Sequence, residues 1–281
     1  MLAKLKSWYR KERESPPVEV RQAAVPPPIE PPPEVQQEIR LALVLNGGVS
    51  LAVWMGGVTH EIDELRRSSW QFPVEGLPSF SAAHAIYTGL LAALRTGLRV
   101  DIIAGSSAGG INGAALAAAI AVRRPLRVEG KPLRDLWIDV GDMTNLLRSA
   151  GERNPPSLLK GDTFMLPQMR KAFASILGDG PAPLQTFSAS ANAEELQAAL
   201  AAERADASAV RLFVTTTAFR PNSRPFTDAL GTAFNVLDNR LRFRFIRDPW
   251  LNRDNFASTG SDMTPAQLMA LAARATASFP V

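Results

Sequence analysis

The sequence predicts a layered α/β fold built around a mostly parallel sheet. The order strand, glycine-rich turn, helix occurs twice before residue 110, and repeated units of this kind are typical of parallel sheets covered by helices. The 281 residues, 46% of them hydrophobic, suffice for one large domain with a buried core. We expect that domain over residues 38–281.

The first half of the domain shows the clearest elements. Residues 38–45 are mostly apolar and predict a buried strand, and a helical pattern runs from Ser50 to about Ser68. A second helix is predicted from Ala82 to Thr96, and a second strand at 99–104. Residues 108–123 are rich in small side chains and predict a further helix.

The second half predicts helices and strands in a less regular order. The expected helices are 132–148, 162–177, 192–204 and 264–278, and the expected strands are 209–218, 225–235 and 240–247. Ligands of such folds bind at the carboxyl ends of the strands, where both glycine-rich turns lie.

Residues 1–37 predict a disordered N-terminal arm outside the domain. The first 15 residues are basic and aromatic, and eight of the 22 prolines fall between Pro16 and Pro33. The basic start is either a contact for an anionic membrane surface or a solvated tail. It lacks the apolar core of a secretory signal, and the apolar stretch around 114–122 is too short to span a bilayer. We therefore expect a cytoplasmic chain, with peripheral membrane contact left open.

The composition excludes several classes of function. The chain has no cysteine and two histidines, which excludes a disulfide scaffold and a cysteine nucleophile and disfavours a multi-histidine metal centre. A formal net charge of +4 is no surplus of the kind that nucleic-acid binding requires. We expect no metal, no cofactor and no nucleic acid.

The second turn fits a nucleophile elbow. Residues 105–109 read Gly-Ser-Ser-Ala-Gly between a strand and a helix, with Gly105 and Gly109 on either side of Ser107. In a sharp strand-to-helix turn, the residues two positions before and two positions after the central residue lie so close together that their side chains would collide. The central hydroxyl then stands exposed at a helix N-terminus, which favours negative charge. A tight turn without catalytic function is the alternative.

Other readings of these turns fit poorly. A phosphate loop needs Lys-Ser/Thr after its last glycine, and neither turn matches a dinucleotide fingerprint. No histidine follows His84, so a Ser-Asp-His triad is excluded. A serine–lysine pair would need Lys131, Lys160 or Lys171. A serine–aspartate dyad is the economical choice.

The first turn predicts an oxyanion hole. A glycine pair between a strand and a helix lets the amides of Gly47, Gly48 and Val49 converge on an anion. A simple tight turn is the alternative, and the elbow that follows favours the oxyanion hole.

The two turns together resemble the patatin-like phospholipases. The match is strongest to the bacterial patatin-related branch, which carries the block Leu-Asn-Gly-Gly-Val-Ser-Leu-Ala-Val-Trp-Met-Gly-Gly found here at 45–57. The resemblance implies a three-layer α/β/α sandwich and a Ser-Asp dyad that hydrolyses acyl esters of lipids. On this resemblance Ser107 is the nucleophile, and the substrate is an acyl lipid or phospholipid of a phospholipase A or lysophospholipase.

Two departures from the family pattern bear on activity. Val49 stands where the broader family has a third glycine, and Leu51 where it has arginine. The family's aspartate lies in an Asp-Gly-Gly or Asp-Gly-Ala motif, whereas the Asp-Gly pair here begins at Asp179 in a glycine/proline loop. Residues 271–280 resemble the helix before that motif, so we expect the aspartate beyond Val281, with Asp179 as a weak candidate. A catalytically incomplete fragment or lipid-binding scaffold is the alternative function.

Two weaker features concern lipid contact. An apolar helix face is a candidate acyl pocket, or else ordinary core, at Trp54, Met55 and Val58. Alternating arginines on one strand face are candidates for phospholipid head groups, or else a solvated surface, at Arg240, Arg242 and Arg244.

Overall fold

The computed structural model describes residues 37–48, 51–69, 82–149, 151–152, 157–184 and 192–278. The predicted N-terminal arm therefore lies outside the described residues, except for Gln37, which opens the first strand. Within the described ranges, every helix is too short or too polar to cross a membrane.

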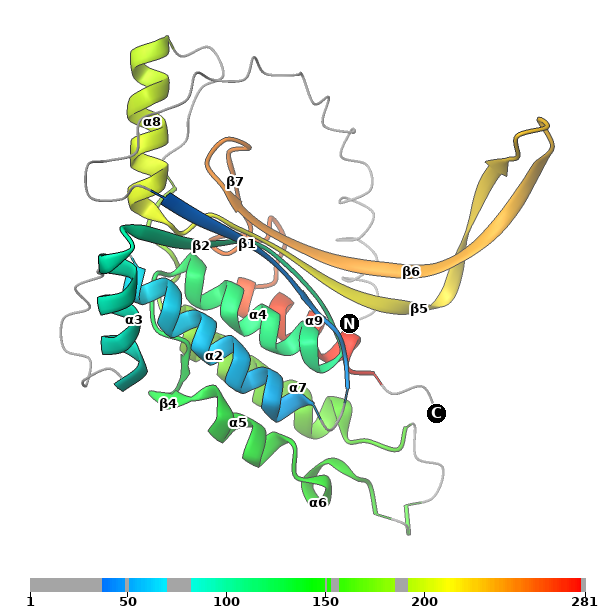
Figure 1. Ribbon diagram of the computed structural model, residues 1–281. Coiled ribbons are helices and arrows are strands. Elements are labelled where there is room, and N and C mark those ends of the chain that lie inside the picture. The colour runs from blue at the N-terminus through cyan, green and yellow to red at the C-terminus, as the bar shows by residue number, and fades with distance from the viewer. Residues whose placement is uncertain are drawn as a thin grey trace.

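A mixed five-stranded sheet forms the centre of the molecule, in the order β1-β2-β5-β6-β7 (Figure 1). Its first three strands are parallel, and the last two are antiparallel to their neighbours, so the predicted parallel core is confirmed. The strands are β1 (Gln37–Leu45), β2 (Thr96–Ser106), β5 (Val210–Thr227), β6 (Ala233–Asp248) and β7 (Arg253–Asp254).

Three helices pack directly beneath the sheet in Figure 1, and α4 is the central one. They are α2 (Ala52–Ser69), α4 (Ala108–Ala121) and α9 (Pro265–Thr276). Helix α7 (Leu166–Leu177) packs on α4 and α9. The remaining elements are α3 (Ala82–Ala93), β3 (Arg127–Val128), β4 (Lys131–Pro132), α5 (Leu133–Val140), α6 (Met143–Leu146), the π-helical turn η1 (Gly161–Met165) and α8 (Ala193–Asp206).

Helix α4 is buried over its whole length because its side chains are small. It contacts β1, β2 and β5 on the sheet side and α2, α7 and α9 on the others. At Gly113 an added Cβ would lie 2.8 Å from the Ile103 side chain, so glycine lets the helix approach the sheet. The run of alanines that predicted this helix thus also sets the spacing of the layers around it.

Three predicted elements differ from those observed. Thr96 was predicted to end the second helix, but α3 ends at Ala93 because Arg95 takes a positive φ of 47° and turns the chain into β2. The helix predicted at 132–148 is divided at Gly141, and the carboxylate of Asp142 caps α6 instead. A local cap therefore overrides the helical periodicity.

The strand predicted at 225–235 is wrong, since it spans a turn. β5 and β6 are two long strands joined at residues 228–232, where Gly231 has a φ of 87°. The Asp228 carboxylate accepts hydrogen bonds from the amides of Leu230 and Thr232 at 2.9 and 2.8 Å. Such an aspartate-centred turn can interrupt a sequence whose composition still favours strand.

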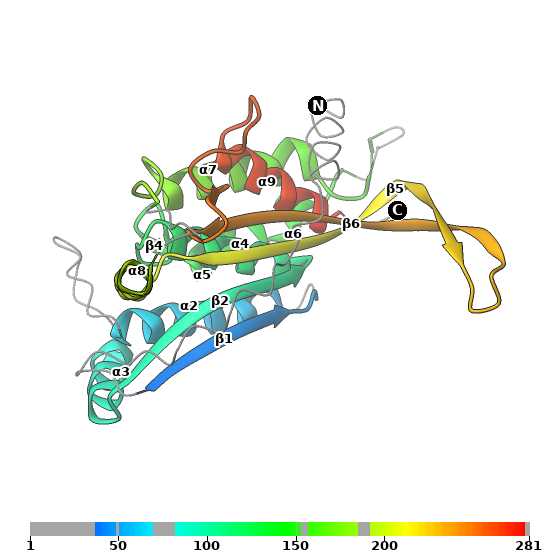
Figure 2. The same ribbon diagram turned by 90° about the horizontal axis from the view of Figure 1, so that it is seen from above.

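The outer part of this pair, residues 217–240, projects beyond the rest of the sheet and is called here the β5–β6 hairpin (Figures 1 and 2). β2 pairs with β5 only as far as Thr215. Beyond that point, the described residues pair the two strands only with each other.

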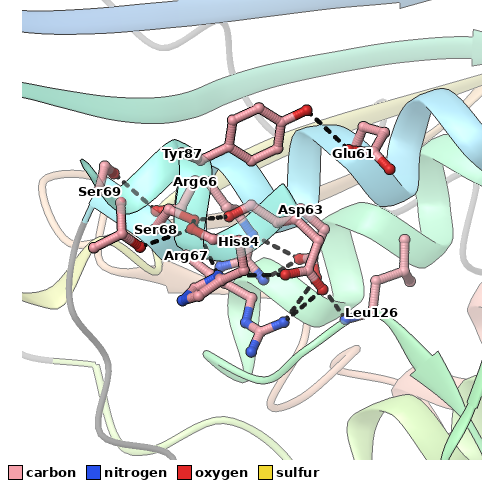
Figure 3. Close-up of polar contacts among 11 residues, drawn as sticks. Glu61, Asp63, Arg66, Arg67, Ser68, Ser69, His84, Tyr87 and Leu126 are labelled. Atoms are coloured by element: carbon pink, nitrogen blue, oxygen red, sulfur yellow. Dashed lines mark hydrogen bonds and ion pairs between the residues drawn. The ribbon is translucent and has the colours of Figure 1, made fainter. Parts of the chain in front are cut away.

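A cluster of buried charges fastens the end of α2 to its surroundings (Figure 3). Asp63 is 1% exposed, and its carboxylate pairs with Arg66 at 2.6 Å and accepts the amide of Leu126 at 2.8 Å. The neighbouring Glu64 lies 3.3 Å from the ring nitrogen of His84 on α3. The cluster therefore joins α2 to α3 and to the segment that follows α4.

Replacing Asp63 by alanine should lower the free energy of unfolding by about 3–5 kcal/mol, because it leaves Arg66 buried without its partner charge. Chemical denaturation measures the change. The matched control is Asp162→Ala, which removes an aspartate, 69% exposed, from its pair with Arg274 and should cost less than about 1 kcal/mol. Equal losses in the two variants would contradict the role of the buried cluster.

Candidate active site

A single residue, Ser107, connects β2 to α4 without any loop. β2 ends at Ser106 and α4 begins at Ala108. Ser107 has φ 52° and ψ −128°, a conformation that costs a non-glycine residue about 1–3 kcal/mol. Such strain persists only where the surrounding structure enforces it, and it marks this residue as a candidate nucleophile.

The two flanking glycines allow this turn. A Cβ added to Gly105 would lie 2.5 Å from the Gly109 carbonyl oxygen. One added to Gly109 would lie 2.1 Å from the carbonyl oxygen of Leu45. Both positions therefore exclude every other residue, and Gly109 also brings the start of α4 against the end of β1.

The Gly47 backbone lies directly beside the Ser107 side chain. A Cβ built on Gly47 would come within 2.7 Å of the Ser107 Cβ and 3.5 Å of its Oγ. Neither Gly47 nor Gly48 donates its amide to an acceptor among the described residues. Val49, the third residue predicted for the oxyanion hole, lies outside them. The structure thus brings the two glycine-rich turns together at one edge of the sheet.

The start of α4 supplies further amides at the same place. The Ile111 amide is the first of these to donate a helical hydrogen bond, which it makes to the Ser107 carbonyl at 3.1 Å. The amides before Ile111 in the first turn of α4 have no intrahelical acceptor, as at any helix N-terminus, and they favour negative charge beside Ser107.

Thr276, at the end of α9, holds the elbow in place. Its Oγ1 accepts the Ser107 amide at 2.7 Å and donates to the Thr215 carbonyl at 2.6 Å. One hydroxyl therefore joins the elbow, β5 and α9. The sequence does not reveal this residue, because no local motif relates two positions 169 residues apart.

The structure does not bring Asp179 to the elbow. Asp179 is exposed just beyond α7, where the neighbouring Gly178 contacts Arg124, beyond the C-terminal end of α4. The fourteen residues of α4 span roughly 21 Å, with Ser107 at the opposite end. Among the described residues, no carboxylate makes a hydrogen bond with the Ser107 hydroxyl.

The predicted apolar face of α2 divides into two environments. Met55 is 5% exposed and belongs to the core. Trp54 is 65% exposed, and with Val58 and Tyr87 it lines an open, mostly apolar groove of about 390 Å³. The groove is therefore the part of this face that can accept a ligand.

Comparison with known proteins identifies the family of this chain. A family model described as "Patatin-like phospholipase" matches residues 43–281, which include both glycine-rich turns. The chain belongs to the patatin-like phospholipase family. This confirms the predicted resemblance and, with the parallel strands and flanking helices, the predicted three-layer α/β/α fold class.

One curated relative of this patatin-like chain is "Uncharacterized membrane protein Rv3479" of Mycobacterium tuberculosis. The two are 37% identical over 256 residues, which cover 87% of the present chain. They cover 21% of the relative, so the patatin-like chain spans about a fifth of that protein. No solved structure matches the chain.

Replacing Thr276 by valine should lower the free energy of unfolding by about 1–3 kcal/mol, because the Ser107 amide loses its acceptor. Thr276→Ser keeps the hydroxyl and should retain most of that stability. Thermal denaturation of both variants measures the difference. If valine and serine are equivalent, the hydroxyl bridge does not stabilise the elbow.

Proposed function

We propose that this patatin-like chain is a serine hydrolase of lipid acyl esters, of the phospholipase A or lysophospholipase type. Its family acts on lipid substrates, which supports the substrate class. The observation that carries the proposal is the strained Ser107, set at a helix N-terminus against the backbone of Gly47. The assignment as a carboxylic ester hydrolase rests on the same residue.

The proposed reaction has two steps. The Ser107 Oγ bonds to the ester carbonyl carbon, a base takes the hydroxyl proton, and the C–O bond to the alcohol breaks as the alcohol receives that proton. Water then attacks the acyl-serine and releases the fatty acid. We assign the oxyanion to the amides of Gly47, Gly48 and Val49, with those of the first turn of α4 beside them.

For the base we propose an aspartate that forms a dyad with Ser107. Asp179 is poorly placed, since it lies at the other end of α4. The contact between Thr276 and Ser107 supports a different origin, because it places the C-terminal end of α9 beside the elbow. We therefore propose that the aspartate follows Val281 in the full-length protein.

A lipid-binding scaffold or catalytically incomplete fragment is the second candidate. The observation that favours it is the Ser107 hydroxyl, which meets no carboxylate among the described residues. The scaffold would bind lipid while ester hydrolysis stays at background.

We also propose that the protein works in the cytoplasm, peripherally on a membrane. The lipid substrate class supports contact with a lipid surface, and the mycobacterial relative is described as a membrane protein.

Covalent labelling of the full-length protein with a fluorophosphonate tests the proposal. The wild-type protein should be labelled. Ser107→Ala should lose the label, and the rate of any ester hydrolysis should fall at least about 10³-fold. The adjacent Ser106→Ala is the matched control and should keep both. Labelling that persists in Ser107→Ala would overturn the assignment of the nucleophile, and labelling without turnover would favour the incomplete form.

A further inference from the structure

The β5–β6 hairpin exposes an unusual amount of apolar surface. Phe219 and Leu230 are 97% and 92% exposed, and Leu237 is 68% exposed. Other large apolar side chains of the hairpin that face solvent are Phe226, Phe234 and Val236. Scattered apolar residues are common on surfaces, but a concentration on one projecting element marks a binding surface.

These apolar side chains lie on both faces and at the tip. Phe226 and Phe234 are cross-strand partners whose rings lie 5.2 Å apart, so they share a face. Leu237 pairs with Ser223 on the opposite face, because successive residues of a strand alternate. Leu230 occupies the turn between them. A partner protein would cover one face of this ribbon, whereas a lipid environment surrounds both.

The base of the hairpin is cationic. Arg220 is exposed, and no acidic side chain pairs with it among the described residues. Arg240 is also exposed, but Asp238 lies 2.9 Å from its guanidinium and 3.0 Å from that of Arg224. The hydrogen bond from Arg240 holds the pKa of Asp238 at about 2, so this carboxylate stays charged. It therefore offsets part of the positive charge of Arg224 and Arg240.

The hairpin leaves the sheet at the edge that holds Ser107. Ser106, at the carboxyl end of β2, pairs with Thr215 of the parallel strand β5, which then continues outward. From Thr215 to Thr227 the strand extends roughly 40 Å, so the tip lies well away from the elbow (Figures 1 and 2). An attachment at the tip therefore acts as a tether for the Ser107 edge.

We propose that the β5–β6 hairpin binds the surface of an anionic phospholipid bilayer. Phe226, Leu230 and Phe234 insert among the acyl chains, while Arg220 contacts the headgroup phosphates. The purpose of this binding rests on the proposed function, because a tether raises the local concentration of Ser107 at its lipid substrate. The binding itself requires no catalysis.

Co-sedimentation with vesicles of phosphatidylglycerol and phosphatidylcholine tests the proposal on the 281-residue chain. The wild type should sediment with these vesicles, and binding should weaken in high salt and with phosphatidylcholine alone. Leu230→Asp should weaken binding by about tenfold or more, because an inserted leucine is lost. Arg220→Gln should weaken it by roughly fivefold.

Matched control variants come from the helices. Ile86→Asp removes an apolar side chain of α3 that is 67% exposed, and Arg170→Gln removes an exposed arginine of α7. Both should bind vesicles like the wild type. Unfolding midpoints of all variants should match that of the wild type, since the replaced side chains are exposed. Equal loss of binding in control and hairpin variants would overturn the proposal.

A separate measurement keeps the failure of this proposal distinct from failure of the proposed function. Fluorophosphonate labelling of Ser107 in the full-length protein, without vesicles, should be unchanged in the hairpin variants, and Ser107→Ala should still bind vesicles. Intact labelling without vesicle binding overturns the hairpin proposal alone, and vesicle binding without labelling overturns the hydrolase alone. A dimer that Leu230→Asp dissociates, with no vesicle binding, assigns the hairpin to a second copy instead.

Discussion

The backbone at Ser107 is the constraint on which the site depends. Connecting a strand to a helix through one residue forces a positive φ and brings the first turn of α4 against the ends of β1 and β2. The glycines at 47, 105 and 109 are each required by a contact with neighbouring backbone or with Ser107 itself. The strain and the close approach therefore have the same origin, and both leave the hydroxyl next to main-chain amides.

The packing of α4 explains how the molecule sustains this turn. A helix buried on all sides cannot shift to relieve strain at its N-terminus without disturbing the sheet and three other helices. Its small residues permit this close packing, and Thr276 fastens the elbow from the side of α9. The geometry at Ser107 is thus fixed by distant parts of the chain as well as by its own glycines.

Local steric rules made part of this structure predictable. The spacing of Gly105, Ser107 and Gly109 anticipates the turn because the collision avoided at Gly105 is with Gly109, only four residues along the chain. The close approach of Gly109 to Leu45 appears only in the folded structure. The predicted strand at 225–235 failed because the Asp228 turn lies within a stretch of strand-forming composition. Thr276 could not be found, since its role appears only when α9 and β2 meet in space. The exposure of Trp54 and the burial of Met55 were likewise settled by which side of α2 faces the sheet.

The Thr276 bridge also bears on the order in which the protein acquires its structure. It joins positions 169 residues apart, so the chain must close a very long loop before the Ser107 amide finds its acceptor. During synthesis, the turn after β2 emerges long before the helix that completes it. In a nascent chain the Ser107 amide therefore lacks its Thr276 acceptor until translation has passed α9.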